Sequence, residues 1–378
     1  MRYVAPGSGS GLPGPDVRKL SEYSFEVGPI RPPSEGGSHS LLIRATRNCS
    51  WNRCRFCYGM PYNREKFELR TVEDVKKDLD SARAIADGIG AVSWKMGYGG
   101  ALNRAVGSAI IESDPALDGN NCFVMVFNWL YFGGRTVFLQ DGNTLIMPTD
   151  QLLEIVRYLK TGFPTVERIT SYARAKTLAK KSLEELKELQ RAGLSRLHVG
   201  LETGDDEVLA YVDKGVTSAE QIVAGKKAKE AGFELSEYVM PGLGGRAMWE
   251  QHAKNTARVL NETNPDFIRL RPLVVGPGLP LYEDYAKGVF ELSSPHERLR
   301  ELKVMVENLD VTGRLCFDHF LNGWYRDSAR RQTLFKQDYG GYRLPEEKRL
   351  VLDLIEEGLR IDESVHMHAK DLVGLTHL

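Results

Sequence analysis

Apolar residues along this chain fall in short runs that alternate with stretches of helical periodicity. The first run, SLLIRATR at 40–47, is followed from Thr71 by Thr-Val-Glu-Asp, which is a typical helix start. Strands separated by helical crossovers are typical of a parallel sheet. We expect further strands at 135–140, 167–172, 196–201, 234–240 and 266–273, with helices from Thr149, Ser182, Asp205, Thr217 and Met248.

The six strands predict an α/β fold, a partial (β/α)6 TIM-like barrel with an inserted lid segment and a helical C-terminal extension. A flat doubly wound sheet has the same spacing and stays an alternative. In both architectures the loops after the carboxyl ends of the strands carry the chemistry. The first of these loops contains three cysteines.

The repeat also divides the chain. Residues 1–39 are rich in Gly, Pro and Ser and predict an extended lead-in. Residues 40–283 form the expected core, with an insertion at about 88–134 that is too long for a plain connector. Residues 284–378 are expected to form amphipathic helices that cover the barrel, one at 296–308 and one that starts at Pro345.

Composition narrows the class of protein. Fifty basic residues against fifty-one acidic ones give a net charge of −1, so neither a nucleic-acid nor a membrane-surface partner is expected. The longest apolar run, 122–132, is shorter than the roughly 18 to 20 residues of a membrane span, and we expect a buried element there. No secretory signal is recognised at the N-terminus. Five cysteines are too few for a disulfide framework, so we expect a cytoplasmic protein with a metal site.

Cys49, Cys54 and Cys57 form the pattern C-x4-C-x2-C, rimmed by aromatic residues. Thiolates are soft ligands that select zinc, copper(I) or iron-sulfur clusters. Zinc would need a fourth ligand, and the nearby histidine is His39. An iron-sulfur cluster normally takes four cysteines, but Cys122 is set in an apolar segment where a buried core role is expected, as is the fifth cysteine, Cys316. Three ligands leave one iron open, as a catalytic site requires.

The loop and its surroundings resemble the radical S-adenosylmethionine (radical SAM) superfamily. The stretch from Arg44 to Gly59 reads R-x-x-R-N-C-S-W-N-R-C-R-F-C-Y-G, although the superfamily's common motif has three residues between the first two cysteines. The chain looks like an uncharacterised subgroup with a HemN- or MiaB-like core and no cobalamin-binding, TRAM or auxiliary-cluster domain. Its other shared motifs are RPPSE at 31–35, LQDGN at 139–143 and GLETG at 200–204.

The resemblance, which covers about residues 30–275, implies the cofactors. A [4Fe-4S] cluster would sit on Cys49, Cys54 and Cys57, and its open iron would bind the amino and carboxylate groups of S-adenosylmethionine. An electron from a flavodoxin- or ferredoxin-type donor would then split the sulfonium. The resulting 5′-deoxyadenosyl radical would abstract hydrogen from a substrate. Such an enzyme would be oxygen-sensitive.

The resemblance also suggests residues that bind S-adenosylmethionine. Asp141 lies where the superfamily contacts the methionine ammonium, although an ordinary Asp-Gly turn is the alternative. Glu202 matches a carboxylate that approaches the cofactor, and Lys214 would pair with the methionine carboxylate unless it is a solvated helix-end lysine. The full expected set is Phe56, Tyr58, Asp141, Gly142, Asn143, Ser171, Arg174, Glu202, Lys214 and Met240.

Substrate contacts are expected from two later segments. Arg269 and Arg271 share one face of a strand and could hold a carboxylate or phosphate, or form salt bridges with covering helices. His319 and Asn322, three residues apart on an expected helix, are further candidates, although such a histidine is more often structural.

Three classes of function therefore stay open. The leading hypothesis is a radical SAM enzyme that acts on a small molecule. A noncatalytic iron-sulfur or zinc protein is the first alternative. Modification of RNA or protein by radical SAM chemistry is the second, although the balanced charge offers no nucleic-acid-binding surface.

Overall fold

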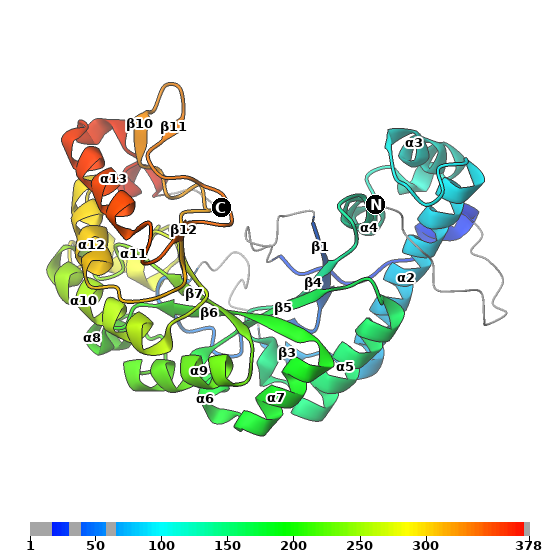
Figure 1. The fold of residues 1–378 in the computed structure, drawn as a ribbon, viewed down its shortest axis with the longest axis horizontal. Helices are drawn as coiled ribbons and strands as arrows, with labels where there is room; N and C mark the ends of the chain where they lie inside the picture. Colours follow the sequence, from blue (N-terminus) through cyan, green and yellow to red (C-terminus); the bar gives the residue numbers. More distant parts are fainter. Residues whose placement is uncertain (1–16, 30–38, 58–65, 374–378) are drawn as a thin grey trace. The chain divides into compact units, whose positions relative to one another are not determined.

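The computed structural model describes residues 17–29, 39–57 and 66–373 (Figure 1). Tyr58 and the stretch 31–35 lie outside these residues. The chain forms two compact units. The first comprises 1–47, 68–172 and 188–195, and the second comprises 48–67, 173–187 and 196–378.

The first unit is built on three parallel strands, β1 (Ser40–Arg44), β4 (Thr136–Gln140) and β5 (Arg168–Ala173). The helices α2 (Val72–Lys95) and α5 (Thr149–Gly162) pack side by side beside them (Figure 1). Thr71 caps α2 by accepting a hydrogen bond from Asp74 N–H, as its sequence predicts. A short antiparallel pair, β2 (Thr46–Arg47) and β3 (Glu68–Leu69), flanks the cysteine loop in sequence.

The segment predicted as an insertion is helical. The end of α2 is followed by α3 (Arg104–Ser113) and α4 (Asn121–Tyr131). The apolar run at 122–132 is thus mainly α4, and its buried face includes the fully buried Trp129. Its other face is exposed at Val124 and Tyr131, so the expectation of a buried element is right for one face only.

The second unit continues the strand and helix repeat with four parallel strands. These are β6 (Leu194–Glu202), whose residues from Arg196 belong to this unit, β7 (Glu234–Val239), β8 (Phe267–Leu270) and β9 (Arg314–Cys316). Helices α6 (Ala175–Lys180) and α7 (Leu183–Ala192) precede β6, and the residues of α7 from Glu188 belong to the first unit. Helices α8 (Asp206–Tyr211), α9 (Ser218–Glu230) and α10 (Gly245–Thr263) connect the later strands.

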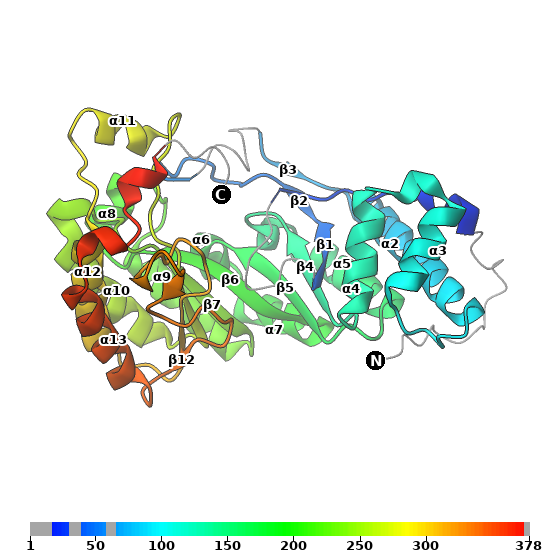
Figure 2. The same ribbon diagram turned by 90° about the horizontal axis from the view of Figure 1, so that it is seen from above.

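The last hundred residues combine helices and strands. Helices α11 (Pro280–Ala286), α12 (Pro295–Glu307) and α13 (Lys348–Arg360) are present (Figure 2). Helix α12 packs between α10 and α13 (Figure 1). The strands β9, β10 (Tyr325–Asp327), β11 (Gln332–Thr333) and β12 (Tyr342–Arg343) were not predicted. The helix expected at 316–325 is wrong: β9 ends at Cys316 and a non-helical loop follows it.

The α/β class built from parallel strand and helix repeats is confirmed. Local signals located the elements well, because caps such as the Thr217 and Glu220 capping box are short-range features. The C-terminal strands escaped prediction because two or three residues carry no periodicity of their own. Across the described residues, every helix is too short or too polar to cross a bilayer.

Candidate active site

The cysteine loop lies in the second unit, against an apolar cluster. Phe56 is buried there with Val212, Leu243 and other residues, and both Cys54 and Cys57 pack on the same cluster. Burial raises the pKa of the Cys57 thiol to about 12 and also raises that of Cys54. The charges of Cys49 and Cys54 contribute to the shift at Cys57, so the three sulfurs are close enough to interact.

Two cations stand beside these thiols. Lys214 and Arg174 both act to lower the pKa of Cys54, against the larger effect of burial. Positive charge of this kind compensates a group of thiolates held in an apolar pocket. The donor set therefore fits a [4Fe-4S] cluster, which needs cysteine thiolates and protection from solvent.

A single zinc ion fits less well. Four ligands around one zinc place the sulfurs at about 2.3 Å from the ion and hence close together. Among the described residues, no three His, Cys, Asp or Glu side chains converge in that way. Cys122 takes no part, since it bonds to the backbone of Phe25 in the first unit, and Cys316 is buried on β9.

Glu202 and Lys214 form a buried ion pair next to the loop. Lys214 Nζ donates to Glu202 Oε1 at 2.8 Å and lies 5.6 Å from the centre of the Phe56 ring. Burial acts to lower the pKa of Lys214, but the negative charges of Glu202 and Cys54 outweigh it and hold the pKa above its ordinary value. Lys214 is therefore a buried cation and not a solvated helix-end lysine.

The glycine of GLETG makes room for this pair. A Cβ atom on Gly200 would lie 2.3 Å from Glu202 Oε1 and 3.0 Å from Lys214 Nζ. Glu202 itself has a left-handed backbone with φ of 63°, and its carbonyl accepts a hydrogen bond from Met240 N–H at 2.9 Å. The predicted residues Phe56, Arg174, Glu202, Lys214 and Met240 are thus grouped around the cysteines within one unit.

Apart from Tyr58, which is outside the described residues, the remaining predicted cofactor residues belong to the first unit. The Asp141 carboxylate is fully buried and accepts two hydrogen bonds from Arg44, at 3.0 and 2.8 Å. Asn143 is also buried, while the Ser171 hydroxyl contacts the backbone carbonyls of Leu139 and Tyr172. Gly142, between Asp141 and Asn143, is partly exposed. The contact of Asp141, Gly142 and Asn143 with a methionine ammonium, and that of Ser171 with the cofactor, stay predictions.

Glu237 was missed by the sequence analysis. It lies on β7, its Oε2 atom has no hydrogen-bond partner, and it is 2% exposed. Burial raises its pKa to about 8, and the negative charge of Glu202 adds to the shift. At neutral pH this carboxyl group is protonated. A single Glu within a strand gives no sign of such burial, which only the packing of neighbouring elements decides.

A row of side chains crosses the strands of the second unit. In register, Gly200 of β6 neighbours Tyr238 of β7, which neighbours Arg269 of β8, which neighbours Cys316 of β9. Residues paired across parallel strands share one face of the sheet. The register shifts between Gly200 and Glu202, but a Cβ atom on Gly200 would point at the Glu202 and Lys214 pair, which places this pair on the same face as Arg269.

Both predicted arginines bind one carboxylate. Arg269 Nη1 donates to Asp318 Oδ2 at 2.7 Å, and Arg271 Nη1 donates to Asp318 Oδ1 at 3.2 Å. Arg269 also donates to Ser236 and is 1% exposed, which makes it structural. Arg271 lies over the Tyr238 ring at 4.8 Å, and its Nη2 atom is buried without a hydrogen-bond partner.

His319 and Asn322 join this cluster through a turn. Asn322 N–H donates to the His319 carbonyl at 2.9 Å, and Asn322 Nδ2 donates to the Leu270 carbonyl. Its Oδ1 atom is buried without a partner. Burial, and then the charge of Arg271, lower the pKa of His319 to about 3, so the imidazole is neutral. His319 Nδ1 accepts from Leu321 N–H, which leaves the proton on Nε2.

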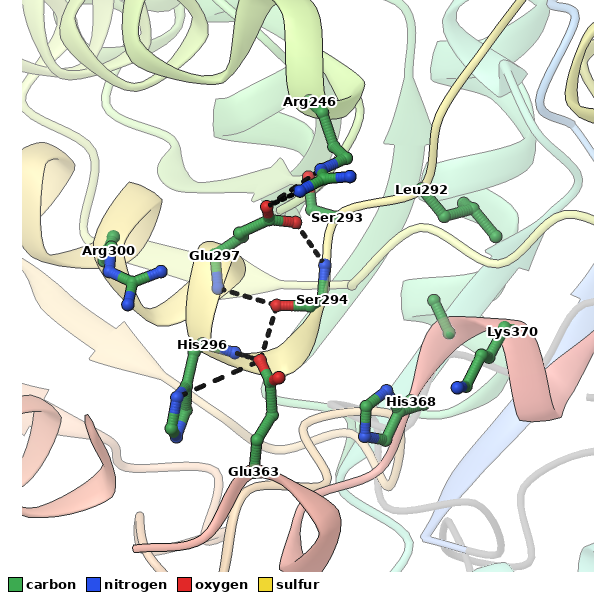
Figure 3. A pocket seen from close by; sticks show the side chains of 11 residues that line it. Arg246, Leu292, Ser293, Ser294, His296, Glu297, Arg300, Glu363, His368 and Lys370 are labelled. Atoms are coloured by element: carbon green, nitrogen blue, oxygen red, sulfur yellow. Dashed lines mark hydrogen bonds and ion pairs between the residues drawn. The ribbon is translucent and has the colours of Figure 1, made fainter. Parts of the chain in front are cut away.

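A separate pocket of about 470 Å³ lies at the start of α12 (Figure 3). Ser294, His296, Glu297 and Glu363 line it with several basic side chains. Glu363 already fills the helix N-terminus, since it accepts from Ser294 Oγ and His296 N–H. None of the predicted site residues lines this pocket, so we do not assign the active site to it.

Comparison with known families supports the class of protein. Residues 126–255 match the family model described as the radical SAM superfamily. This match identifies a radical SAM superfamily domain within the chain. Enzymes of the superfamily bind a [4Fe-4S] cluster and S-adenosylmethionine, so the predicted cofactors and the assignment as an enzyme are confirmed at that level. The matched stretch begins after the cysteine loop.

Individual relatives are distant. The chain is 23% identical over 181 residues to the heme chaperone HemW of Bacillus subtilis, which covers 47% of each chain. It is 27% identical over 110 residues to a tRNA uridine(34) acetyltransferase of Methanocaldococcus jannaschii, covering 29% of this chain and 20% of that protein. The chain thus spans about half or less of the length of these two relatives.

The solved structures that resemble this chain are distant in sequence as well. Coproporphyrinogen III oxidase (HemN) of Escherichia coli, a radical SAM enzyme, gives a TM-score of 0.42 at 17% identity, covering 71% of this chain and 51% of that one. Methylornithine synthase (PylB) gives 0.42 at 16% identity, covering 81% and 78%.

Proposed function

We propose that this chain is a single-cluster radical SAM enzyme whose substrate is a small molecule with one anionic group. The proposal depends on the net charge of the cluster formed by Arg269, Arg271 and Asp318. The buried Arg269 and the largely buried Arg271, whose side chain is 14% exposed, share the single carboxylate of Asp318, and Arg271 Nη2 is a buried atom with no hydrogen-bond partner. A neutral His319 leaves this excess of one positive charge in place. Burying such a charge is costly unless an anion pairs with it.

In this proposal the site residues form two groups on one face of the sheet, one that binds the cofactors and one that binds the substrate. Cys49, Cys54 and Cys57 would hold the cluster, which supplies the electron that splits S-adenosylmethionine. Lys214 would bind the methionine carboxylate and Phe56 would cover the ligand. Arg271 would bind the substrate anion, while Asn322 Oδ1 would accept from a neighbouring donor group of the substrate.

The first test is anaerobic reconstitution with iron and sulfide, followed by reduction in the presence of S-adenosylmethionine. We expect the absorption of an iron-sulfur cluster and release of 5′-deoxyadenosine on chromatography. Cys54→Ala should abolish both, whereas Cys316→Ala should keep both because Cys316 is a buried thiol on β9 with its pKa raised to about 12. Wild-type protein without a cluster, or unchanged behaviour of Cys54→Ala, would contradict the proposal.

The substrate claim is tested with a panel of small carboxylates and phosphates, scored by stimulated 5′-deoxyadenosine release. Arg271→Gln should raise the KM for a stimulating compound about tenfold or more, because a hydrogen bond to a charged group is lost. Its unstimulated cleavage of S-adenosylmethionine should match that of the wild type. Stimulation by neutral compounds, unaffected by Arg271→Gln, would refute the anionic class.

Action on RNA is a second candidate, supported by the similarity to tRNA uridine(34) acetyltransferases. The net charge of −1 argues against it, because RNA binding relies on basic surfaces. Adding unmodified tRNA to the same assay separates the two candidates. Stimulation by tRNA, and not by small anions, would favour the RNA substrate.

A further inference from the structure

The segment from Tyr211 to Gly215, which follows α8, is tied to the cysteine loop by several contacts. Trp51 Nε1 donates to the Asp213 carbonyl at 2.7 Å. Arg55 N–H donates to the Val212 carbonyl at 2.9 Å. The cysteine loop thus fixes the backbone immediately before Lys214.

Arg174 joins the same arrangement from the start of α6. Its Nη2 atom donates to the Lys214 carbonyl at 2.7 Å, and its guanidinium lies over the Trp51 ring at 5.0 Å. One arginine therefore holds both the indole and the backbone of the lysine. Burial lowers the pKa of Arg174, an effect that the charges of Cys49 and Cys54 oppose.

Gly215 shows how closely the two segments fit. Its φ is 68°, and a Cβ atom there would lie 2.4 to 2.8 Å from three atoms of the Trp51 ring. Asp213 is also left-handed, with φ of 50°. A left-handed backbone conformation persists only where neighbouring residues hold it in place. Here those neighbours are Trp51 and Arg174.

These contacts fix the position and direction of Lys214. Its carbonyl and the carbonyl before it are fixed by Arg174 and Trp51, so its side chain leaves the backbone in one direction, toward Glu202 and the Phe56 ring. We infer that Trp51 and Arg174 are positioning residues that deliver Lys214 to S-adenosylmethionine and so make cofactor binding depend on a correctly folded cysteine loop. This inference rests on the proposed function for the role of Lys214.

The test is a double-mutant cycle on reconstituted protein. Trp51→Phe keeps an aromatic ring but removes the hydrogen bond to Asp213. We expect iron and sulfide per chain to match the wild type, and the Kd for S-adenosylmethionine to rise about fivefold, as loss of one ordinary hydrogen bond gives. In a Lys214→Gln background, Trp51→Phe should cause no further rise, because it acts through the lysine. Trp94→Phe, at an exposed position, is the matched control.

Two outcomes overturn the inference. If Trp51→Phe and Lys214→Gln raise the Kd additively, the tryptophan does not act through the lysine. If Trp51→Phe loses its iron, the tryptophan holds the loop and not Lys214.

Hydrogen exchange on the cluster-free protein keeps the test independent of the proposed function. The amides of Asp213 and Lys214 bond to the carbonyls of Ala210 and Leu209 and should exchange slowly. Trp51→Phe should speed their exchange severalfold, and Trp94→Phe should not. Unchanged exchange would refute the positioning role, whereas wild-type protein that binds no S-adenosylmethionine would refute the proposed function alone.

Discussion

Glu237→Gln should change how the stability of the protein depends on pH. In the folded chain the pKa of Glu237 is raised to about 8 from an ordinary value of 4.5 by burial and by Glu202. Between these two values the folded state holds a proton that the unfolded state has released. The free energy of unfolding therefore falls as pH rises, by about 1.4 kcal/mol per pH unit.

The expected magnitude follows from that slope. Summed over pH 5 to 8, the contribution of Glu237 falls by about 3 kcal/mol, and it is lost entirely above the folded pKa. Glutamine has nearly the same shape and stays neutral, so Glu237→Gln should be the more stable protein above pH 7. Below pH 5 the two proteins should be nearly equal in stability.

The assay is urea unfolding of both proteins at pH values from 5 to 9, followed by circular dichroism. The difference between the two curves cancels every other titrating group. Glu230→Gln, at an exposed end of α9, serves as the matched control and should show no such trend. A difference between wild type and Glu237→Gln that is constant with pH, or that grows toward acid, would refute the reasoning.

Two further substitutions test the packing of the site. Gly215→Ala should cost about 1 to 3 kcal/mol of stability in thermal melts, because φ is 68° and the Trp51 ring blocks the new methyl group. Gly162→Ala is the control and should be harmless, because the space around Gly162 is open. Equal losses of stability in the two variants would contradict the contact between Gly215 and Trp51. Asp318→Asn should cost about 3 to 5 kcal/mol by leaving the buried Arg269 guanidinium without its carboxylate partner. Asp353→Asn breaks an exposed pair on α13 and should cost less than about 1 kcal/mol, so similar losses would show that the buried cluster is not charged as assigned.

Features that depend on residues close together in the chain could be predicted from the sequence. Strand and helix positions followed from short apolar runs and caps, and the three cysteines stood out by spacing alone. Glu202 and Lys214, twelve residues apart, were both expected at the cofactor, and the structure joins them in one ion pair.

Features that depend on distant packing could not be predicted. Asp318 falls in a segment predicted as a helix, so its position between Arg269 of β8 and Arg271 of the following loop could not be predicted. Glu237 looks like any polar residue in a strand until the surrounding elements bury it. The contact of Trp51 with Asp213 joins residues 162 positions apart, and no local pattern records it.

That separation has a consequence for the order in which the protein is made. The three cysteines leave the ribosome well before the segment that packs on their loop, since Trp51 and Asp213 are 162 positions apart in the chain. Until then the thiols have no apolar cluster or lysine beside them and face solvent. We expect that nascent chains halted before Val208 bind no stable cluster, so that iron and sulfide are loaded only after more than half of the chain has been synthesised.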